Sequence, residues 1–296
     1  MEWESVLLEV RDLHKRFGDK VALDGVSLSV EPGHMFGFVG ANGAGKTTTM
    51  RIAMGVLVPD SGQVHWNGKE LTQSGRSNFG YMPEERGLYP KMKIAAQIAY
   101  FGELAGMTPA AAKRASGDWL DRLGLGDRGN DFVQDLSLGN QQRVQLAVAL
   151  VHDPEMLILD EPFSGLDPIA VDTMAAVLEE RSKAGVPVVF SSHQLELVER
   201  LCDTVGIISA GKMVAVGTVA ELRARGNRRL RVTVSDATPG WESALAVPTT
   251  AVGDDEWLFD TTDDQRVLQA ATAAGRVTRF GYDEPSLADI FREASS

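Results

Sequence analysis

The 296-residue chain contains a single cysteine, Cys202, so it can form neither an internal disulfide bond nor a cysteine-based metal site. A lone thiol is typical of a reducing compartment. No apolar stretch approaches the length of a membrane-spanning helix, and one of the longest, Val144 to Val151, is interrupted by Gln145. The first residues lack the basic start of a secretory signal. We therefore expect a cytosolic protein that reaches a membrane only through a partner.

An excess of positive charge is also missing. The chain has 29 lysines and arginines against 41 aspartates and glutamates, which gives a net charge of −12. This balance argues against a nucleic-acid-binding surface as the main function, so we expect no nucleic-acid partner. The hydrophobic share of 44% is ordinary for a globular protein, and the length allows one large or two modest domains.

A glycine-rich loop lies between an apolar run, Met35 to Val39, and a stretch with the pattern of a helix. Glycine, four variable residues and then Gly-Lys-Thr form a phosphate-binding loop in this setting. Backbone N–H groups and the dipole of the following helix attract phosphates. Lys46 can reach the β- and γ-phosphates, and the Thr47 hydroxyl can hold Mg²⁺. The residues expected to bind the phosphates are Gly40, Asn42, Gly43, Ala44, Gly45, Lys46, Thr47 and Thr48.

Two carboxylates follow a second apolar run, Met156 to Leu159, which has the composition of a buried central strand. Ligands of open α/β sheets bind at the carboxyl ends of the strands, where Asp160 is expected. Asp160 can hold a water molecule on Mg²⁺. Glu161 can accept a proton from a water molecule that attacks the γ-phosphate.

The order of the expected elements predicts an α/β protein. Strand and helix patterns alternate from residue 140 to 209, which indicates a largely parallel, doubly wound sheet. A helix-rich insert over residues 93–123 interrupts this pattern. Residues 226–229 have the composition of a linker, and the remainder of the chain predicts a small α+β appendage.

The segment Leu136 to Arg143 connects these features. Ser137 before a long helix would by itself be an ordinary N-cap. Between the phosphate loop and Asp160, however, the segment resembles the signature motif of ATP-binding-cassette (ABC) ATPases. In the same family order, Phe17 matches the aromatic residue that stacks on adenine, and His193 matches the switch histidine that contacts the γ-phosphate. Residues 164–167 match the D-loop, which ends at Asp167.

The resemblance covers about residues 5–225 and implies a P-loop NTPase fold of the ABC type. We expect residues 1–225 to form the nucleotide-binding domain, with a RecA-like core sheet and an N-terminal antiparallel β subdomain. A helical subdomain is expected at about residues 91–140. Residues 228–296 are expected to form a small α+β accessory domain.

The resemblance further implies ATP and Mg²⁺ as ligands and a head-to-tail dimer, formed by two copies or with a second ABC ATPase. The γ-phosphate would then face Ser137 and Gly139 of the other subunit. The residues carried over as catalytic are Lys46, Glu84, Glu161 and His193. Those carried over as nucleotide-binding are Phe17, the phosphate loop, Ser137, Gly139 and Asp167. Those carried over as metal-binding are Thr47, Glu84 and Asp160.

The chain departs from the family pattern most clearly at the Q-loop. Glutamine normally follows the strand that is expected here at Phe79 to Met82, and Glu84 takes its place. A carboxylate can still ligate Mg²⁺, but it adds negative charge beside the triphosphate. Ala41 replaces a frequent proline, and Leu138 and Asn140 replace signature residues. Because Ser137 and Gly139 are kept, we expect function to survive.

The segments Gly80–Pro90 and Glu284–Phe291 are similar to those of bacterial exporter ATPases of the sodium-efflux and drug-resistance type. This resemblance implies a peripheral subunit on the cytoplasmic face of the cell membrane that powers transport through a separate integral membrane permease. The alternative is a soluble ABC ATPase that acts on ribosomes or nucleic acid, although one phosphate loop, no heptad arm and the acidic balance disfavour it. A P-loop regulatory switch protein is disfavoured by the signature segment and Glu161.

Overall fold

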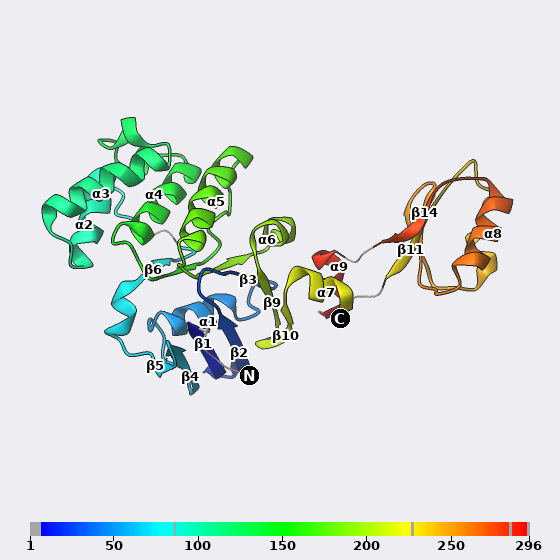
Figure 1. The fold of residues 1–296 in the computed structure, drawn as a ribbon, viewed down its shortest axis with the longest axis horizontal. Coiled ribbons are helices and arrows are strands. Elements are labelled where there is room, and N and C mark those ends of the chain that lie inside the picture. The colour runs from blue at the N-terminus through cyan, green and yellow to red at the C-terminus, as the bar shows by residue number, and fades with distance from the viewer. Residues whose placement is uncertain (1–6, 86, 226–227, 284–285, 295–296) are drawn as a thin grey trace. The chain divides into compact units, whose positions relative to one another are not determined.

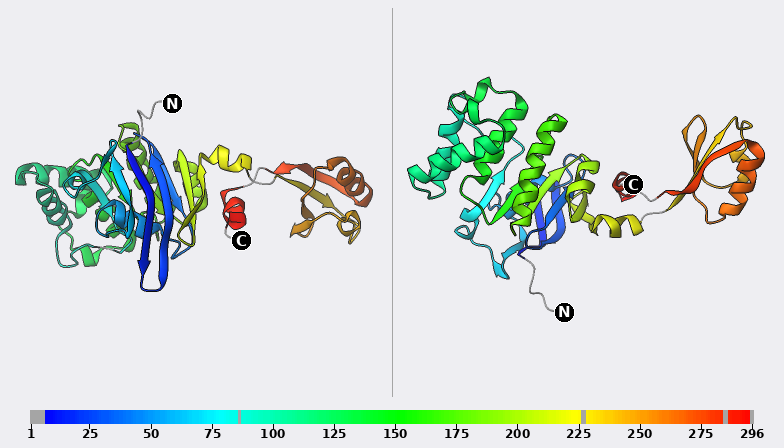
Figure 2. Two further views of the ribbon diagram at one scale, coloured as in Figure 1. Left: turned by 90° about the horizontal axis from the view of Figure 1, so that it is seen from below. Right: turned by 45° about the horizontal axis from the view of Figure 1, so that its top comes forward.

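The computed structural model describes residues 7–85, 87–225, 228–283 and 286–294. The chain divides into two compact units between Val219 and Ala220 (Figures 1 and 2). No helix in the described ranges is long and apolar enough to cross a membrane. Some residues used in the predictions lie outside these ranges, namely 1–6 at the N-terminus, 226 and 227 of the expected linker, 295 and 296 of the expected accessory domain, and Arg86, Glu284 and Pro285 of the segments similar to exporter ATPases.

A six-stranded sheet with the order β10-β9-β3-β8-β7-β6 forms the centre of the first unit. All neighbouring strands are parallel except β10, which runs antiparallel to β9. Strands β3, β7 and β8 are buried at every position, as expected for a parallel sheet covered on both faces. The strands are β3 (Met35–Val39), β6 (Phe79–Met82), β7 (Met156–Leu159), β8 (Val188–Ser192), β9 (Thr204–Ser209) and β10 (Lys212–Gly217).

Helices connect these strands, and Pro168 and Pro109 each stand in the first turn of one, where a missing N–H is tolerated. Helices α2, α3 and α4 pack on one another to form the helical region of this unit. The helices are α1 (Lys46–Ala53), α2 (Ile94–Leu104), α3 (Pro109–Arg122), α4 (Leu138–Leu150), α5 (Pro168–Lys183) and α6 (Leu195–Leu201). Short 3₁₀ turns lie at Gly75–Asn78, Gly126–Arg128 and Val133–Asp135.

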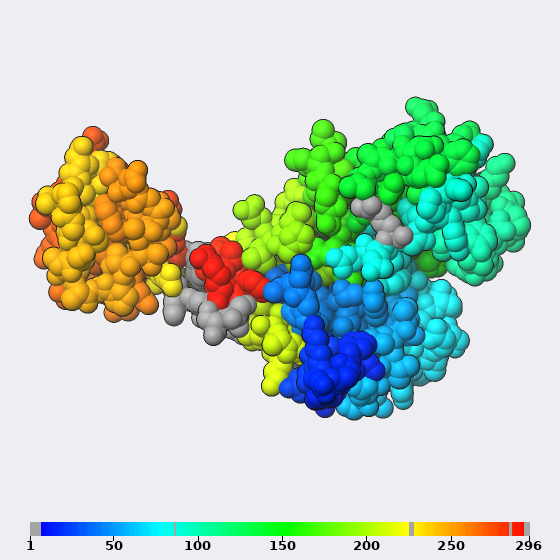
Figure 3. Space-filling model, turned by 180° about the vertical axis from the view of Figure 1, so that it is seen from behind, coloured from blue at the N-terminus to red at the C-terminus, as the bar shows by residue number. Residues whose placement is uncertain are grey.

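An antiparallel sheet with the order β2-β1-β4-β5 completes the first unit. Figure 3 shows this β subdomain in blue beside the helices in cyan and green. Its strands are β1 (Leu8–Phe17), β2 (Lys20–Val30), β4 (Ser61–Trp66) and β5 (Lys69–Glu70). Strands β1 and β2 form one long hairpin, as an N-terminal antiparallel β subdomain requires. The register shifts after Val10, where Asp12 has a φ of 50°.

The second unit contains an antiparallel sheet with the order β12-β13-β11-β14 and the chain order β-3₁₀-β-β-α-β, which is a ferredoxin-like arrangement. Its core includes Trp241, Trp257 and Phe259. The edge strand β12, exposed at four of its five positions, was not expected from the sequence. The elements are α7 (Val219–Arg225), β11 (Arg229–Ser235), a 3₁₀ turn (Glu242–Leu245), β12 (Thr249–Gly253), β13 (Glu256–Phe259), α8 (Asp264–Ala274), β14 (Arg276–Asp283) and α9 (Leu287–Ala294).

Candidate active site

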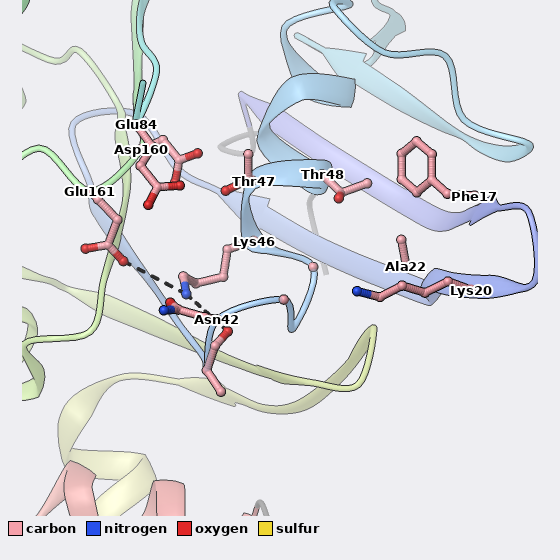
Figure 4. A pocket seen from close by; sticks show the side chains of 13 residues that line it. Phe17, Lys20, Ala22, Asn42, Lys46, Thr47, Thr48, Glu84, Asp160 and Glu161 are labelled. Carbon is pink, nitrogen blue, oxygen red and sulfur yellow. Dashed lines mark hydrogen bonds and ion pairs between the residues drawn. The ribbon is translucent and has the colours of Figure 1, made fainter. Parts of the chain in front are cut away.

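A pocket of about 390 Å³ lies where β3 ends and α1 begins (Figure 4). Its walls come from the glycine-rich loop, the β1–β2 hairpin and the segments that follow β6 and β7. The residues that line it are Phe17, Lys20, Ala22, Ala41, Asn42, Gly43, Gly45, Lys46, Thr47, Thr48, Glu84, Asp160 and Glu161.

The glycine-rich loop depends on glycine at positions where a side chain cannot fit. Gly45 has a φ of 119°, and a Cβ atom there would lie 2.9 Å from the carbonyl oxygen of Ala22. A Cβ atom at Gly40 would lie 2.6 Å from the carbonyl oxygen of Ile208. The backbone can therefore curl closely around the first turn of α1, whose N–H groups have no partner within the helix. This is the geometry that binds phosphate.

Lys46 is the first residue of α1 and is only 6% exposed. Its Nζ atom donates a hydrogen bond of 2.6 Å to the carbonyl oxygen of Gly40. The same atom lies 3.9 Å from Oε1 of Glu161 across the pocket. The ammonium group is thus held over the loop, where it can contact phosphate oxygens.

Asp160 and Glu161 share one partner. The hydroxyl of Ser191, which is fully buried on β8, donates to Oδ1 of Asp160 at 2.6 Å and accepts from the backbone N–H of Glu161 at 2.8 Å. The other carboxylate oxygen of Asp160 is buried, and the described residues give it no hydrogen-bond partner. Burial raises the pKa of the nearby Tyr81 hydroxyl, and the charge of Asp160 adds to this effect.

The residues that line this part of the pocket fit a bound Mg²⁺. The unpartnered oxygen of Asp160, the hydroxyl of Thr47 and the carboxylate of Glu84 are hard oxygen ligands, and Figure 4 shows all three side chains in the same part of the pocket. Within the described part of the chain, no group of three or more His, Cys, Asp or Glu side chains encloses a metal by itself. A cation here would therefore share its coordination with phosphate oxygens and water.

Glu161 has a φ of 50°, in the left-handed region that non-glycine residues rarely adopt. Such conformations cluster at functional sites, where neighbouring contacts maintain them. Oε2 of Glu161 lies 2.9 Å from Nδ1 of His193, whose side chain is 59% exposed. The carboxylate therefore lies between a lysine and a histidine at the mouth of the pocket.

Most of the predicted nucleotide-binding residues meet in this pocket, but some do not line it. Gly40 and Ala44 lie behind the loop surface, and His193 contacts the pocket through Glu161. The predicted residues Ser137 and Asp167 act here as N-caps of α4 and α5, at 3.4 Å from the N–H of Asn140 and 2.8 Å from that of Ala170. Gly139, in the first turn of α4, is likewise not part of the lining.

The sequence predictions omitted Lys20, Ala22 and Ser191. Lys20 and Ala22 reach the pocket because β2 of the hairpin passes alongside the loop, and nothing in their local sequence indicates this. Ser191 had a weak signal, because serines rarely interrupt a buried apolar strand unless they have a hydrogen-bonding task.

A glycine-rich loop, a buried lysine and a carboxylate pair on a parallel sheet define a nucleotide-binding site of the P-loop class. Comparison with family models matches residues 23–164 to "ABC transporter" and residues 217–295 to "ATP-binding protein DrrA1-3-like, C-terminal domain". The chain belongs to the ABC transporter ATP-binding proteins and is an ATP-hydrolysing subunit of that family.

The similarity to known relatives extends over nearly the whole chain. The chain is 39% identical to the uncharacterized ABC transporter ATP-binding protein YhaQ of Bacillus subtilis over 97% of its own length and 98% of that protein. It is 35% identical to the linearmycin resistance ATP-binding protein LnrL of the same organism, covering 77% and 75% of the two chains. A solved ATP-binding subunit of an ABC transporter aligns with a TM-score of 0.69 and 32% identity, covering 74% of this chain and 92% of that one.

Proposed function

We propose that this subunit powers export through a separate integral membrane permease by ATP-driven, head-to-tail dimerisation. One observation supports the head-to-tail dimer. The signature residues Ser137 and Gly139 begin a helix but do not line their own chain's pocket. A helix N-terminus with free N–H groups is a good partner for the γ-phosphate of a nucleotide on a second subunit.

We assign the parts of the reaction as follows. Lys46 and the glycine-rich loop bind the phosphates of ATP, and Phe17 stacks on the adenine. Thr47, Asp160 and Glu84 hold Mg²⁺, which neutralises phosphate charge when it is bound. Glu161 accepts the proton of the attacking water.

The remaining site residues orient these groups. His193 contacts Glu161 and reaches the γ-phosphate, and Asp167 lies in the D-loop at the dimer face. Ser137 and Gly139 of the second subunit complete the donor shell only when the two bodies close, so hydrolysis is tied to dimer formation. The second subunit is another copy of this chain or a related ABC ATPase.

In this assignment residues 1–225 form the ATPase domain, with the helical subdomain at about residues 91–140 and the accessory domain at residues 228–296. The helical subdomain is the proposed docking site of the permease. Tyr100 and Leu104 are exposed apolar residues there, and the exposed ring of Tyr89, just before the subdomain, lies 6.2 Å from that of Tyr100. An exposed apolar group of this kind is typical of a protein-binding surface.

Export is supported by the drug-resistance name of the relative LnrL. A chain that binds a permease in this way resides on the cytoplasmic face of the cell membrane. Affinity purification from detergent-solubilised membranes tests this proposal. We expect a polytopic membrane protein to co-purify in stoichiometric amount, whereas co-sedimentation with ribosomes in place of a membrane partner would support the alternative function instead.

A matched pair of variants tests the docking surface. Leu104→Glu places a charge among the exposed aromatic residues and should abolish permease binding while basal ATP hydrolysis persists. Val58→Glu alters an even more exposed apolar residue, at 75% exposure, outside that surface and should leave permease binding intact. Equal binding by both variants would place the permease elsewhere.

A further inference from the structure

The signature helix α4 carries two buried glutamines on one side. Gln142 is 4% exposed and Gln145 is 3% exposed. Residues three positions apart lie on the same face of a helix. The amide nitrogen of Gln142 donates a hydrogen bond of 3.2 Å to the carbonyl oxygen of Glu161. That of Gln145 donates a bond of 2.6 Å to the carbonyl oxygen of Pro83, the residue before Glu84.

Both acceptors belong to segments that carry a carboxylate of the pocket. Glu161 follows β7, and Glu84 follows β6, against which α4 packs. The two strands are parallel neighbours, so both segments lie at the same edge of the sheet. One helix therefore holds the backbone beside each of these two pocket carboxylates.

The two glutamines differ from the other buried residues of α4, which include Val144, Leu146 and Leu150. A buried amide costs free energy unless each of its polar atoms is paired. The described residues give the side-chain oxygen of Gln145 no hydrogen-bond partner. The contribution of this amide is therefore the bond that it donates to the backbone before Glu84.

The bond from Gln142 acts on a strained residue. Glu161 has a φ of 50°, and its N–H is held at 2.8 Å by the hydroxyl of Ser191. Its carbonyl oxygen accepts from the amide of Gln142 and from the backbone N–H of Ser164, each at 3.2 Å. Because the peptide groups on both sides of Glu161 are fixed, the direction in which its side chain leaves the backbone is fixed as well. The bond from Gln145 anchors the chain one residue before Glu84 in the same manner.

We propose that Gln142 and Gln145 are positioning residues, through which α4 sets the carboxylates of Glu161 and Glu84 for hydrolysis. The inference rests on the roles assigned above to Glu161 and Glu84. It also connects the two ATP sites of the proposed dimer, because the first turn of α4 contains the residues assigned to the partner's nucleotide. When α4 shifts on closure of the dimer, the two amides transmit the movement to both carboxylates.

Gln142→Met and Gln145→Met test the proposal, since methionine has a similar volume and no amide donor. We expect each variant to lower kcat about three- to tenfold, as loss of one hydrogen bond predicts. The KM for ATP and ATP-dependent dimer formation should change little, and the midpoint of thermal unfolding should fall no further than in a variant that loses a bond of the same kind elsewhere. Ser116→Ala is the matched control, because Ser116 is also buried and donates a bond to a backbone carbonyl, that of Ala95, between α3 and α2.

Two further readouts separate positioning from a general structural role. In a Glu161→Gln background, measured by single-turnover hydrolysis, Gln142→Met should have no further effect, because the residue acts only through Glu161. Gln145→Met should raise the Mg²⁺ concentration at half-maximal activity, because it displaces Glu84, whereas Gln142→Met should not.

The outcomes distinguish this inference from the proposed function. If Gln142→Met lowers hydrolysis equally with glutamate and with glutamine at position 161, the positioning role of Gln142 is overturned. An unchanged Mg²⁺ titration of Gln145→Met overturns that of Gln145. A fall in kcat of the same size in the Ser116→Ala control would show that the loss follows stability alone, and it overturns both. Near-normal hydrolysis by Glu161→Gln alone would instead remove the assignment of Glu161 as the base.

Discussion

Nδ1 of His193 lies 2.9 Å from Oε2 of Glu161, although 32 positions separate the two residues in the sequence. Their strands explain the contact. β7 and β8 are parallel neighbours in which Leu159 pairs with Phe190, so the segments that follow the two strands emerge side by side. The register of the sheet therefore brings a proposed base and its histidine partner together.

We expect His193→Ala to lower kcat at least tenfold and to change the Kd for ATP far less, because His193 orients Glu161 and its proposed contact with the nucleotide is with the γ-phosphate alone. Single-turnover hydrolysis and equilibrium binding of a fluorescent ATP analogue measure the two quantities. His34→Ala is the control, since His34 lies 3.7 Å from Glu31 outside the pocket. A large loss of ATP affinity in His193→Ala would contradict this role.

Glu161→Gln should bind ATP but hydrolyse it on the order of a hundredfold more slowly or worse, because an amide cannot accept the proton of the attacking water. The variant should accumulate as a closed dimer when ATP and Mg²⁺ are present. Size-exclusion chromatography with and without ATP measures this change. A variant that stays monomeric with ATP bound would argue against the head-to-tail dimer.

Glu84→Gln should weaken Mg²⁺ binding, because it replaces a negatively charged oxygen ligand beside Asp160 by a neutral amide. Hydrolysis measured against free Mg²⁺ concentration should reach half-maximal activity at a higher concentration than in the unmodified protein. Glu85→Gln supplies the control, as its side chain is exposed and does not line the pocket. An unchanged titration for Glu84→Gln would show that its charge does not act on the metal.

Much of the pocket could be predicted from the sequence because its parts are local patterns. The glycine-rich loop must precede a helix, and Asp160 must end a buried strand. Parallel strands bring such ends to one edge of the sheet. Knowledge of the family order added Phe17, Glu84 and His193, whose local sequences are unremarkable.

Contacts that depend on the approach of separate elements could not be predicted in this way. The two hydrogen bonds of Ser191 require β8 to lie beside β7, and the bonds of Gln142 and Gln145 require α4 to pack on β6. Nor did the sequence predict β12, because an exposed edge strand lacks the alternation that marks a buried one.

Burial lowers the pKa of His152, which follows α4, below its ordinary value of about 6.5. The folded protein therefore disfavours the charged imidazole. As the pH falls below about 6.5, the unfolded chain binds a proton that the folded chain resists, so the free energy of unfolding decreases. Urea unfolding at pH 7.5 and 5.5 should show a smaller loss for His152→Gln than for the unmodified protein. The partly exposed His34 supplies the control, as His34→Gln. A loss in His152→Gln equal to that of the unmodified protein would contradict this effect.

The core of the second unit supports a prediction about stability. Phe259 is fully buried on β13, and its ring centroid lies 5.6 Å from that of Trp241. Phe259→Ala removes most of a large side chain from this core and should lower the free energy of unfolding by about 3–5 kcal/mol.

A loss of that size is a large fraction of the stability of an ordinary domain, about 5–15 kcal/mol. Because Trp241 and Trp257 pack edge to face at 5.3 Å in the same core, tryptophan fluorescence during guanidinium unfolding should report an early transition in the variant. Val252→Ala, on the exposed edge strand β12, should change stability by no more than about 0.5 kcal/mol.

ATP hydrolysis by Phe259→Ala should persist at denaturant concentrations below that transition, because every residue that lines the ATP pocket belongs to the first unit. Loss of hydrolysis without denaturant would show that the folded second unit is required for the reaction.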